Sequence, residues 1–139
     1  MSSVNLATKP TLNLEVVKKI AAAAEAEAKK NNWNVVISII DDGGNLIYLQ
    51  RLDGTQIGSV AVSQEKARSA FLFKRPTKAL EDVVLGGRSV MMALPGITPV
   101  EGGLPLMYKE QLVGAIGVSG VKSSEDGIIA KAGADVLLA

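Results

Sequence analysis

Residues 113–126 read VGAIGVSGVKSSED and predict a buried strand that runs directly into a helix. Gly114, Gly117 and Gly120 interrupt the apolar strand, and a glycine inside a strand often marks the close approach of another backbone or a ligand. Ser123 stands three residues before Asp126, which is a capping-box-like start for the helix. Two explanations remain open for the glycines: tight packing of the strand against a helix, or a wall that lines a ligand site.

The whole chain has the composition of one soluble domain spanning residues 1–139. Its hydrophobic share is 47%, its charged share is 21% and its formal net charge is +1, with Lys and Arg scattered among acidic residues. A nucleic-acid-binding protein usually carries a basic patch, and a bilayer span needs about 18 consecutive apolar residues. The sequence shows neither feature, and residues 1–19 lack the apolar stretch of a secretory signal. We therefore expect a cytoplasmic protein with no nucleic-acid partner and no membrane partner.

The residue types that are missing restrict the chemistry, because the chain contains neither cysteine nor histidine. Nucleophile systems of the Ser-His-Asp and Cys-His kinds are therefore excluded. Zinc sites made of imidazole or thiolate are excluded as well, although carboxylates alone can still hold Mg²⁺ or Ca²⁺. Acid–base chemistry would depend on Asp, Glu, Lys or Tyr, and we assign no residue to a metal site.

Periodicity and turn signals predict helices and hairpins along the chain. The expected elements are a helix at 12–31, strands at 33–40 and 46–51, helices at 57–74 and after Pro76, strands at 104–108 and 111–119, and a helix at 124–136. Thr11 is the expected cap of the first helix, and Glu25 with Lys29 is expected to form an ion pair on its solvated side. Hairpins separated by helices point to an α+β fold built on an antiparallel sheet.

The segment 86–103 is rich in Gly and Pro and contains the apolar run 90–94. A long irregular segment inside a compact domain is often functional, and the alternative is a mobile loop with a short helical turn packed on the core. Contiguous apolar residues on a surface favour association, most often into closed symmetric assemblies. We therefore expect a homo-oligomer that is at least a dimer.

Four stretches together resemble one known family: SIIDDGGNLIYLQRLDG at 38–54, QEKARSAFLFKRPT at 64–77, EGGLPL at 101–106 and GAIGVSG at 114–120. Over nearly its whole length the chain is similar to GlcG/HbpS-like proteins, a family that includes the C-terminal domain of PduO-type proteins. The resemblance implies a profilin-like α+β fold, in which helices flank a five-stranded antiparallel sheet, and homo-oligomers from dimers to octamers. Some members bind haem, and others occur in glycolate or diol utilisation systems.

The resemblance implies a small-ligand-binding protein whose ligand is a tetrapyrrole (haem or corrinoid) or a small carboxylate. The resemblance also implies that the protein is accessory to glycolate, diol or glycerol utilisation. Two other hypotheses stay open: an enzyme acting on a small hydroxy acid, aldehyde or diol-derived metabolite, and a structural subunit whose segment 86–103 forms an interface. Lys66 and Asp53 are the acid–base candidates of the enzyme hypothesis.

Asp53, Lys66, Ser69 and Thr77 stand at motif positions of this family. Asp53 is expected to cap the turn that follows it, or to present its carboxylate to a ligand. Lys66 precedes Ala67 on a helix whose Ala67 face is buried, so we expect its ammonium group at the edge of a groove. There it would be solvated, or would pair with Asp53 or with a ligand carboxylate.

A second set of residues would line a pocket opposite that helix: Gly102, Gly103, Pro105 and Ser119. Arg51 and Arg75 are candidates for binding a carboxylate or a phosphate, because guanidinium offers a planar pair of donors. The expected ligand-binding set is therefore Arg51, Asp53, Lys66, Ser69, Gly102, Gly103, Pro105 and Ser119.

Haem binding would need an axial ligand other than histidine. Met107 and Tyr108 are the main candidates, and Met91, Met92 and Tyr48 are further ones. A methionine is more often core filling than a metal ligand, and a strand tyrosine more often packs its ring. We therefore predict weak haem binding, if any, held mainly by apolar contacts.

Overall fold

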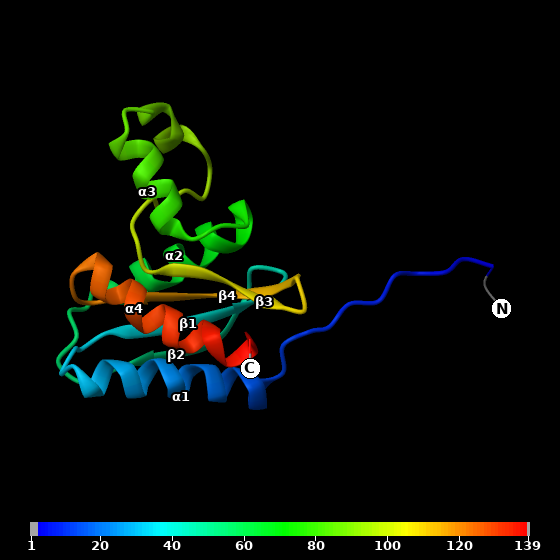
Figure 1. Cartoon of the computed structure of the whole chain (residues 1–139), viewed down its shortest axis with the longest axis horizontal. Helices are drawn as coiled ribbons and strands as arrows, with labels where there is room; N and C mark the ends of the chain where they lie inside the picture. Colours follow the sequence, from blue (N-terminus) through cyan, green and yellow to red (C-terminus); the bar gives the residue numbers. More distant parts are fainter. Residues whose placement is uncertain (1–2, 139) are drawn as a thin grey trace.

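The computed structural model describes residues 3–138 as helices packed on an antiparallel sheet (Figure 1). The elements are α1 (Leu14–Lys30), β1 (Val36–Asp41), β2 (Leu46–Arg51), α2 (Ser59–Phe73), α3 (Thr77–Leu85), the 3₁₀ helix η1 (Ser89–Ala93), β3 (Gly103–Tyr108), β4 (Gln111–Ser119), α4 (Ser123–Ala134) and the 3₁₀ helix η2 (Asp135–Leu138). The predicted helices and strands are all present, with ends shifted by a few residues, and the α+β class is confirmed. Among the described helices none is long and apolar enough to cross a membrane.

The sheet has the strand order β2-β1-β4-β3, so β1 and β4 are its central strands. The expectation of five strands is wrong for residues 3–138, which contain four. β3 forms one edge, and Pro105 within it has no N–H to donate to a further strand. The chain before β3 forms η1 and turns rather than a strand. The profilin-like arrangement stays a prediction.

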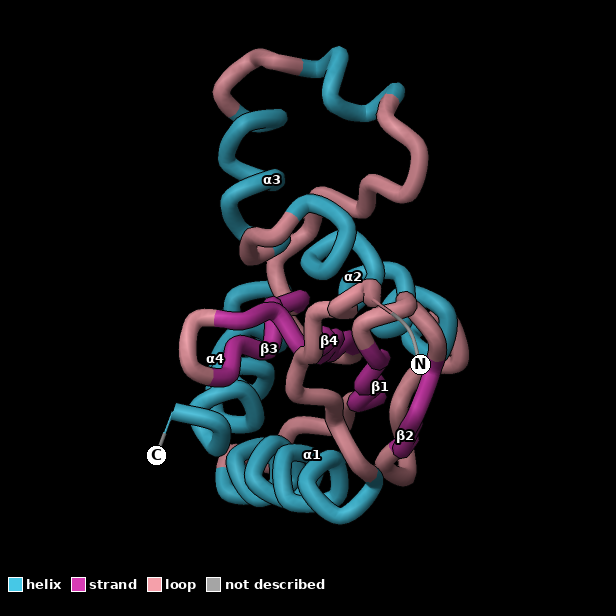
Figure 2. Tube along the Cα trace, turned by 90° about the vertical axis from the view of Figure 1, so that its right-hand side faces the viewer, coloured by secondary structure: helices cyan, strands magenta, loops and turns pink. Residues whose placement is uncertain are grey.

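Helices cover both faces of this sheet (Figures 1 and 2). On one face α1 and α4 pack together over the main core, which includes Val17, Ile37, Ile116 and Ile129. On the other face α2 lies against β1, β4 and β3. α3 and η1 extend away from the sheet beyond α2, and we call residues 81–100 the protrusion (Figure 2).

The first helix begins at Leu14, two residues later than predicted. Asn13 is its N-cap, since the side-chain Oδ1 of Asn13 accepts a hydrogen bond of 2.9 Å from the N–H of Val16. The expectation of a Thr11 cap is wrong, because Thr11 belongs to the extended chain that precedes the helix. An asparagine side chain satisfies one of the backbone donors that the first helical turn leaves unpaired.

The close approach of α2 explains Gly117 in β4. A methyl group at Gly117 would overlap the carbonyl oxygen of Ser63 and lie 2.7 Å from the amide nitrogen of Ala67. At the same interface the hydroxyls of Ser38 and Ser63 share a hydrogen bond of 2.7 Å. Tight packing of strand against helix is therefore confirmed as the explanation of this glycine.

The segment 86–103 contains η1, which buries none of its residues. The alternative of a helical turn packed on the core is therefore wrong. Ser69 of α2 holds the end of the protrusion, because its hydroxyl donates to the carbonyl of Gly96 at 2.5 Å and accepts from the N–H of Thr98 at 2.7 Å. Both bonds of Ser69 thus go to the backbone of the protrusion, rather than to a ligand.

Candidate functional site

Lys66 is buried at the junction of α2, α4 and β4, with 2% of its surface exposed. Its Nζ lies 3.0 Å from Oδ2 of Asp126 and donates to the carbonyl of Val118 at 3.0 Å. Asp126 is equally buried, and its Oδ1 accepts from the N–H of Val121 at 3.2 Å. Burial raises the pKa of the Asp126 carboxyl, and the positive charge of Lys66 acts against that rise.

The expectation that Lys66 lies at a groove edge is wrong, because the fold encloses it and supplies its partner. That partner is Asp126, whereas Asp53 is exposed in the turn after β2. A buried ammonium group with two partners cannot meet a substrate unless the helices separate. The two acid–base candidates of the enzyme hypothesis therefore do not share a site.

The glycine pair before β3 makes room for Lys66. A methyl group at Gly102 would lie 2.8 Å from Nζ of Lys66, and one at Gly103 would overlap the carbonyl of Lys66. The backbone of Gly102 also has a φ of +133°, which residues other than glycine rarely adopt. The N–H of Gly103 donates to the hydroxyl of Thr77 at 2.8 Å. Gly102, Gly103 and Thr77 thus hold α2, α3 and β3 together.

Two other residues of the expected binding set also have structural partners. The hydroxyl of Ser119 donates to the hydroxyl of Ser59 at 3.0 Å beneath α2. Pro105 pairs with Ala115 inside the sheet. Ser119 and Pro105 thus have structural partners in α2 and β4, as Ser69 has in the protrusion.

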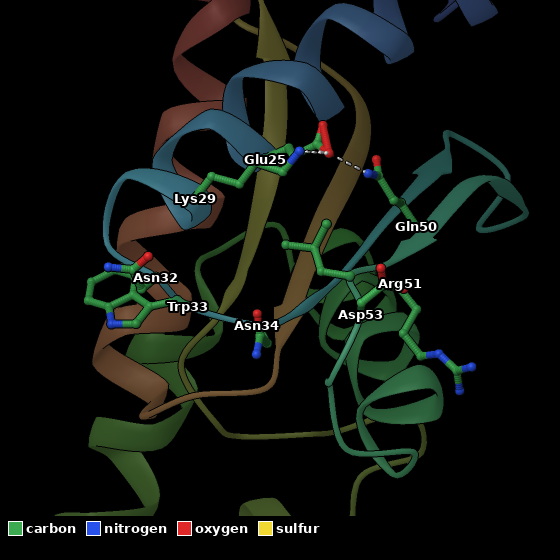
Figure 3. A pocket seen from close by; sticks show the side chains of 9 residues that line it. Glu25, Lys29, Asn32, Trp33, Asn34, Gln50, Arg51 and Asp53 are labelled. Carbon is green, nitrogen blue, oxygen red and sulfur yellow. Dashed lines mark hydrogen bonds and ion pairs between the residues drawn. The ribbon is translucent and has the colours of Figure 1, made fainter.

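A polar hollow of about 430 Å³ lies where the end of α1 meets the end of β2 (Figure 3). We call it the polar hollow, and its lining residues are Glu25, Lys29, Asn32, Trp33, Asn34, Gln50, Arg51, Leu52 and Asp53. Asn32, with a φ of 57°, turns the chain out of α1, and this turn leads Trp33 and Asn34 across the hollow. The structure thus brings Arg51 and Asp53 of the expected binding set into one place.

One wall of the polar hollow is preorganised by Glu25. Its Oε1 lies 3.1 Å from Nζ of Lys29 and accepts from the side-chain amide of Gln50 at 2.8 Å, as the dashed lines in Figure 3 mark. The hydrogen bonds from Lys29 and then Gln50 lower the pKa of Glu25. The expected ion pair of Glu25 and Lys29 is confirmed, and both residues also line this wall of the polar hollow.

The opposite wall carries two charged side chains that are available to bind a ligand. Arg51 and Asp53 are exposed, and neither side chain has a hydrogen bond or ion pair within residues 3–138. The expected cap by Asp53 is wrong, since the hydroxyl of Thr55 closes that turn on the carbonyl of Leu52 at 2.7 Å. In Figure 3 the guanidinium of Arg51 extends outward from β2, away from Trp33. Arg75, by contrast, donates to the carbonyl of Phe73 at 3.0 Å.

Sequence reasoning missed Trp33, Asn34 and Gln50 as lining residues. The available signal was Trp33 itself, which is the single tryptophan of the chain and stands between two asparagines directly after a helix. Binding residues are frequent on such connections, because a rigid scaffold positions them.

A second hollow, of about 270 Å³, is mainly apolar and lies at the other end of α1. We call it the apolar hollow, and it is lined by Pro10, Thr11, Leu12, Val16, Tyr108, Val113 and Leu137. Its volume is below the range of roughly 300–1,000 Å³ that is usual for small-molecule sites. The polar hollow is larger but contains neither methionine nor tyrosine.

The haem candidates do not form a haem site within one chain. Tyr108 lines only the smaller hollow, and Met107 beside it is about one-third exposed. Met91 and Met92 lie in the protrusion, while the hydroxyl of Tyr48 donates to Gln50 at 3.0 Å. Neither of these two hollows combines one of these axial ligands with room for a tetrapyrrole. A further hollow of about 400 Å³ contains none of the candidate ligands, since it is lined by Arg68, Leu72, Phe73, Leu94, Pro95 and Gly96. The residues present therefore do not fit haem.

Comparison with known proteins agrees with this fold. Protein GlcG of Escherichia coli K12 is 44% identical over 112 residues, which cover 81% of this chain and 84% of GlcG. The crystal structure of Klebsiella pneumoniae protein ORFY is 33% identical and superimposes with a TM-score of 0.89, covering 99% of both chains. A crystal structure of a PduOC–haem complex is 25% identical with a TM-score of 0.83, covering 91% of this chain and 95% of PduOC.

The family model described as haem degrading protein HbpS-like matches residues 12–135. This match spans all the helices and strands from α1 to α4. The chain therefore belongs to the HbpS-like family, as the four sequence stretches predicted.

Proposed function

We propose that this protein binds a small hydroxy acid in the polar hollow. The observation that carries the proposal is the pair of exposed charges, Arg51 and Asp53, that lack partners in the described chain beside a hollow of about 430 Å³. A carboxylate would accept two hydrogen bonds from the guanidinium of Arg51 once that side chain turns toward the hollow. A ligand hydroxyl would donate to Asp53.

The opposite wall supports the same class of ligand. Trp33 offers an apolar ring face for a short carbon chain, and Asn34 offers both a donor and an acceptor. Lys29 adds a positive charge that Glu25 already neutralises. The hollow is thus polar and nearly balanced in charge, which suits a small hydroxylated anion better than an apolar ring system.

The family setting gives this proposal its biological context. An accessory role in glycolate, diol or glycerol utilisation would bring the protein together with small hydroxylated metabolites. Such a role needs binding and no acid–base residues, which agrees with the burial of Lys66. We propose ligand binding rather than catalysis on this ground.

Tryptophan fluorescence tests the proposal, because the only tryptophan of the chain lines the polar hollow. Titration with glycolate, lactate or glycerate should change the Trp33 emission saturably. Arg51→Gln should weaken the binding by about tenfold, the usual worth of a hydrogen bond to a charged group. Arg75→Gln is the matched control and should bind normally. Equal loss in both variants, or no response to any of the three acids, would contradict the proposal.

A further inference from the structure

The N-terminal arm, residues 3–8, leaves the body of the molecule as an extended chain (Figure 1). Leu6 within this arm is 85% exposed, which makes it the most exposed large apolar side chain of residues 3–138. Six extended residues reach about 20 Å, far enough to cross onto a neighbouring molecule. An apolar side chain held out on such an arm is stabilised only when another surface covers it.

The root of the arm is fixed to the body. Lys9 forms an ion pair of 2.5 Å with Asp42 in the turn between β1 and β2. Leu12 lies over β4, where a methyl group at Gly114 would come within 2.8 Å of its side chain. The direction of the arm is therefore set by contacts on both sides of Pro10.

The apolar hollow opens beside this root, since Pro10, Thr11 and Leu12 form part of its rim. Its floor is apolar and includes Val113, which is 3% exposed, together with Val16. The hollow therefore has the size and the chemistry to take one aliphatic side chain.

Leu6 of the same chain is poorly placed to fill this hollow. It would have to return within the residues that separate it from Pro10, and this return needs a tight turn at Lys9. A residue that precedes proline strongly favours an extended backbone, and Lys9 is also held by Asp42. The arm therefore points to an acceptor outside its own chain.

We propose that the arm of one copy crosses to a second copy and places Leu6 in the apolar hollow of that partner. Because each arm starts at the rim of its own hollow, a two-fold axis near Pro10 lets both copies exchange arms at once. This gives an isologous contact in which each copy donates and accepts the same segment. The exchange is independent of ligand binding, because the polar hollow lies at the other end of α1, about 25 Å away for a helix of 17 residues.

Disulfide trapping tests the exchange cleanly, because the chain has no cysteine of its own. A Leu6→Cys chain and a Tyr108→Cys chain carrying different tags are co-expressed and oxidised mildly. We expect a disulfide between the two different chains. The control pair, Ile57→Cys with Tyr108→Cys, should not form it, although Ile57 is also highly exposed. Circular dichroism of the reduced proteins verifies that each variant is folded.

The double variant Leu6→Cys/Tyr108→Cys then separates exchange from back-folding. Exchange produces a covalent species of twice the chain mass in denaturing gels without reductant. An internal disulfide at the mass of one chain, or no disulfide, would overturn the proposal.

As a second measurement, Leu6→Asp should raise the dissociation constant of the assembly at least tenfold, whereas Leu6→Met should not. The Trp33 response to hydroxy acids should persist in every arm variant, so failure of exchange and failure of ligand binding remain distinguishable.

Discussion

At the residue scale, the ion pair of Lys66 and Asp126 ties α2 to α4 and β4 through side chains that water does not reach. Removing one partner of a buried pair leaves an uncompensated charge, which typically costs about 3–5 kcal/mol. Replacing both partners by apolar side chains of similar volume removes that charge. The pair therefore behaves as a unit in which a single substitution is worse than a double one.

We expect Asp126→Leu to lower the free energy of unfolding by about 3–5 kcal/mol. The double variant Lys66→Met/Asp126→Leu should recover much of this loss. The matched control is Asp82→Leu, which breaks the exposed pair of Lys78 and Asp82 and should change stability little. Urea unfolding measures all three variants. A double variant less stable than Asp126→Leu would refute this description of the pair.

At the element scale, the packing of α2 on β4 depends on small residues on both sides. Ala67 and Ala70 of α2 face Ala115 and Gly117 of β4, so the two backbones lie unusually close. A larger side chain at this contact has to push the helix away from the sheet. Gly117 therefore sets the distance between α2 and the sheet at this contact.

Gly117→Ala should destabilise the protein by about 1–3 kcal/mol, because the added methyl group overlaps the backbone of α2. Gly58→Ala is the control, since a methyl group there would meet nothing within 4 Å. Thermal unfolding of the two variants compares them under one condition. Equal melting temperatures would show that α2 does not press on Gly117.

The elements could be predicted from the sequence because their signals are local. Alternating and helical periodicities located the hairpins and helices, and turn residues marked their ends. The burial of Lys66 could not be predicted, because its partner Asp126 is 60 positions away and only the fold brings them together. The expected fifth strand was a property of the resemblance and of no stretch in this sequence.

The candidate site was predictable only in part. Arg51 and Asp53 were expected as ligand residues from their chemistry and motif position, and both line the polar hollow. Gln50 is the neighbour of Arg51 in β2, whereas Trp33 joins them only through the tertiary contact of α1 with β2. Ser119 and Gly103 stand in conspicuous motifs, but their partners are structural.

At the scale of the whole molecule, the protrusion carries apolar side chains that its own chain does not cover. They are Leu85, Val90, Met92 and Leu94, with exposed fractions from 40% to 76%. Such a surface is usually covered by another protein surface. The protrusion lies beyond α2 and away from the arm (Figure 1), so it can add a second kind of contact to an assembly.

We expect the protein to sediment as a dimer or a larger closed assembly at tens of micromolar, roughly the range of specific association. Met92→Glu should reduce the assembly, because it places a charge in the contact. Ile57→Glu is the control, since Ile57 is exposed outside the protrusion. A monomer for the unchanged protein would contradict this expectation.

Haem binding should be weak, because neither hollow joins an axial ligand to room for a tetrapyrrole. Titration with hemin should give a broad change of the Soret band that survives Met107→Leu and Tyr108→Phe. A sharp stoichiometric transition that one of these variants abolishes would name an axial ligand and overturn the expectation.

Ligand binding in the polar hollow is most directly tested by nuclear magnetic resonance of ¹⁵N-labelled protein. The single tryptophan gives one indole signal, which reports on the hollow without ambiguity. Titration with glycolate should shift this signal saturably, together with the backbone amides of residues 32–34 and 50–53. Shifts confined to the surroundings of Tyr108, or no shift of the indole signal at saturating hydroxy acid, would contradict the assignment of the polar hollow as the binding site.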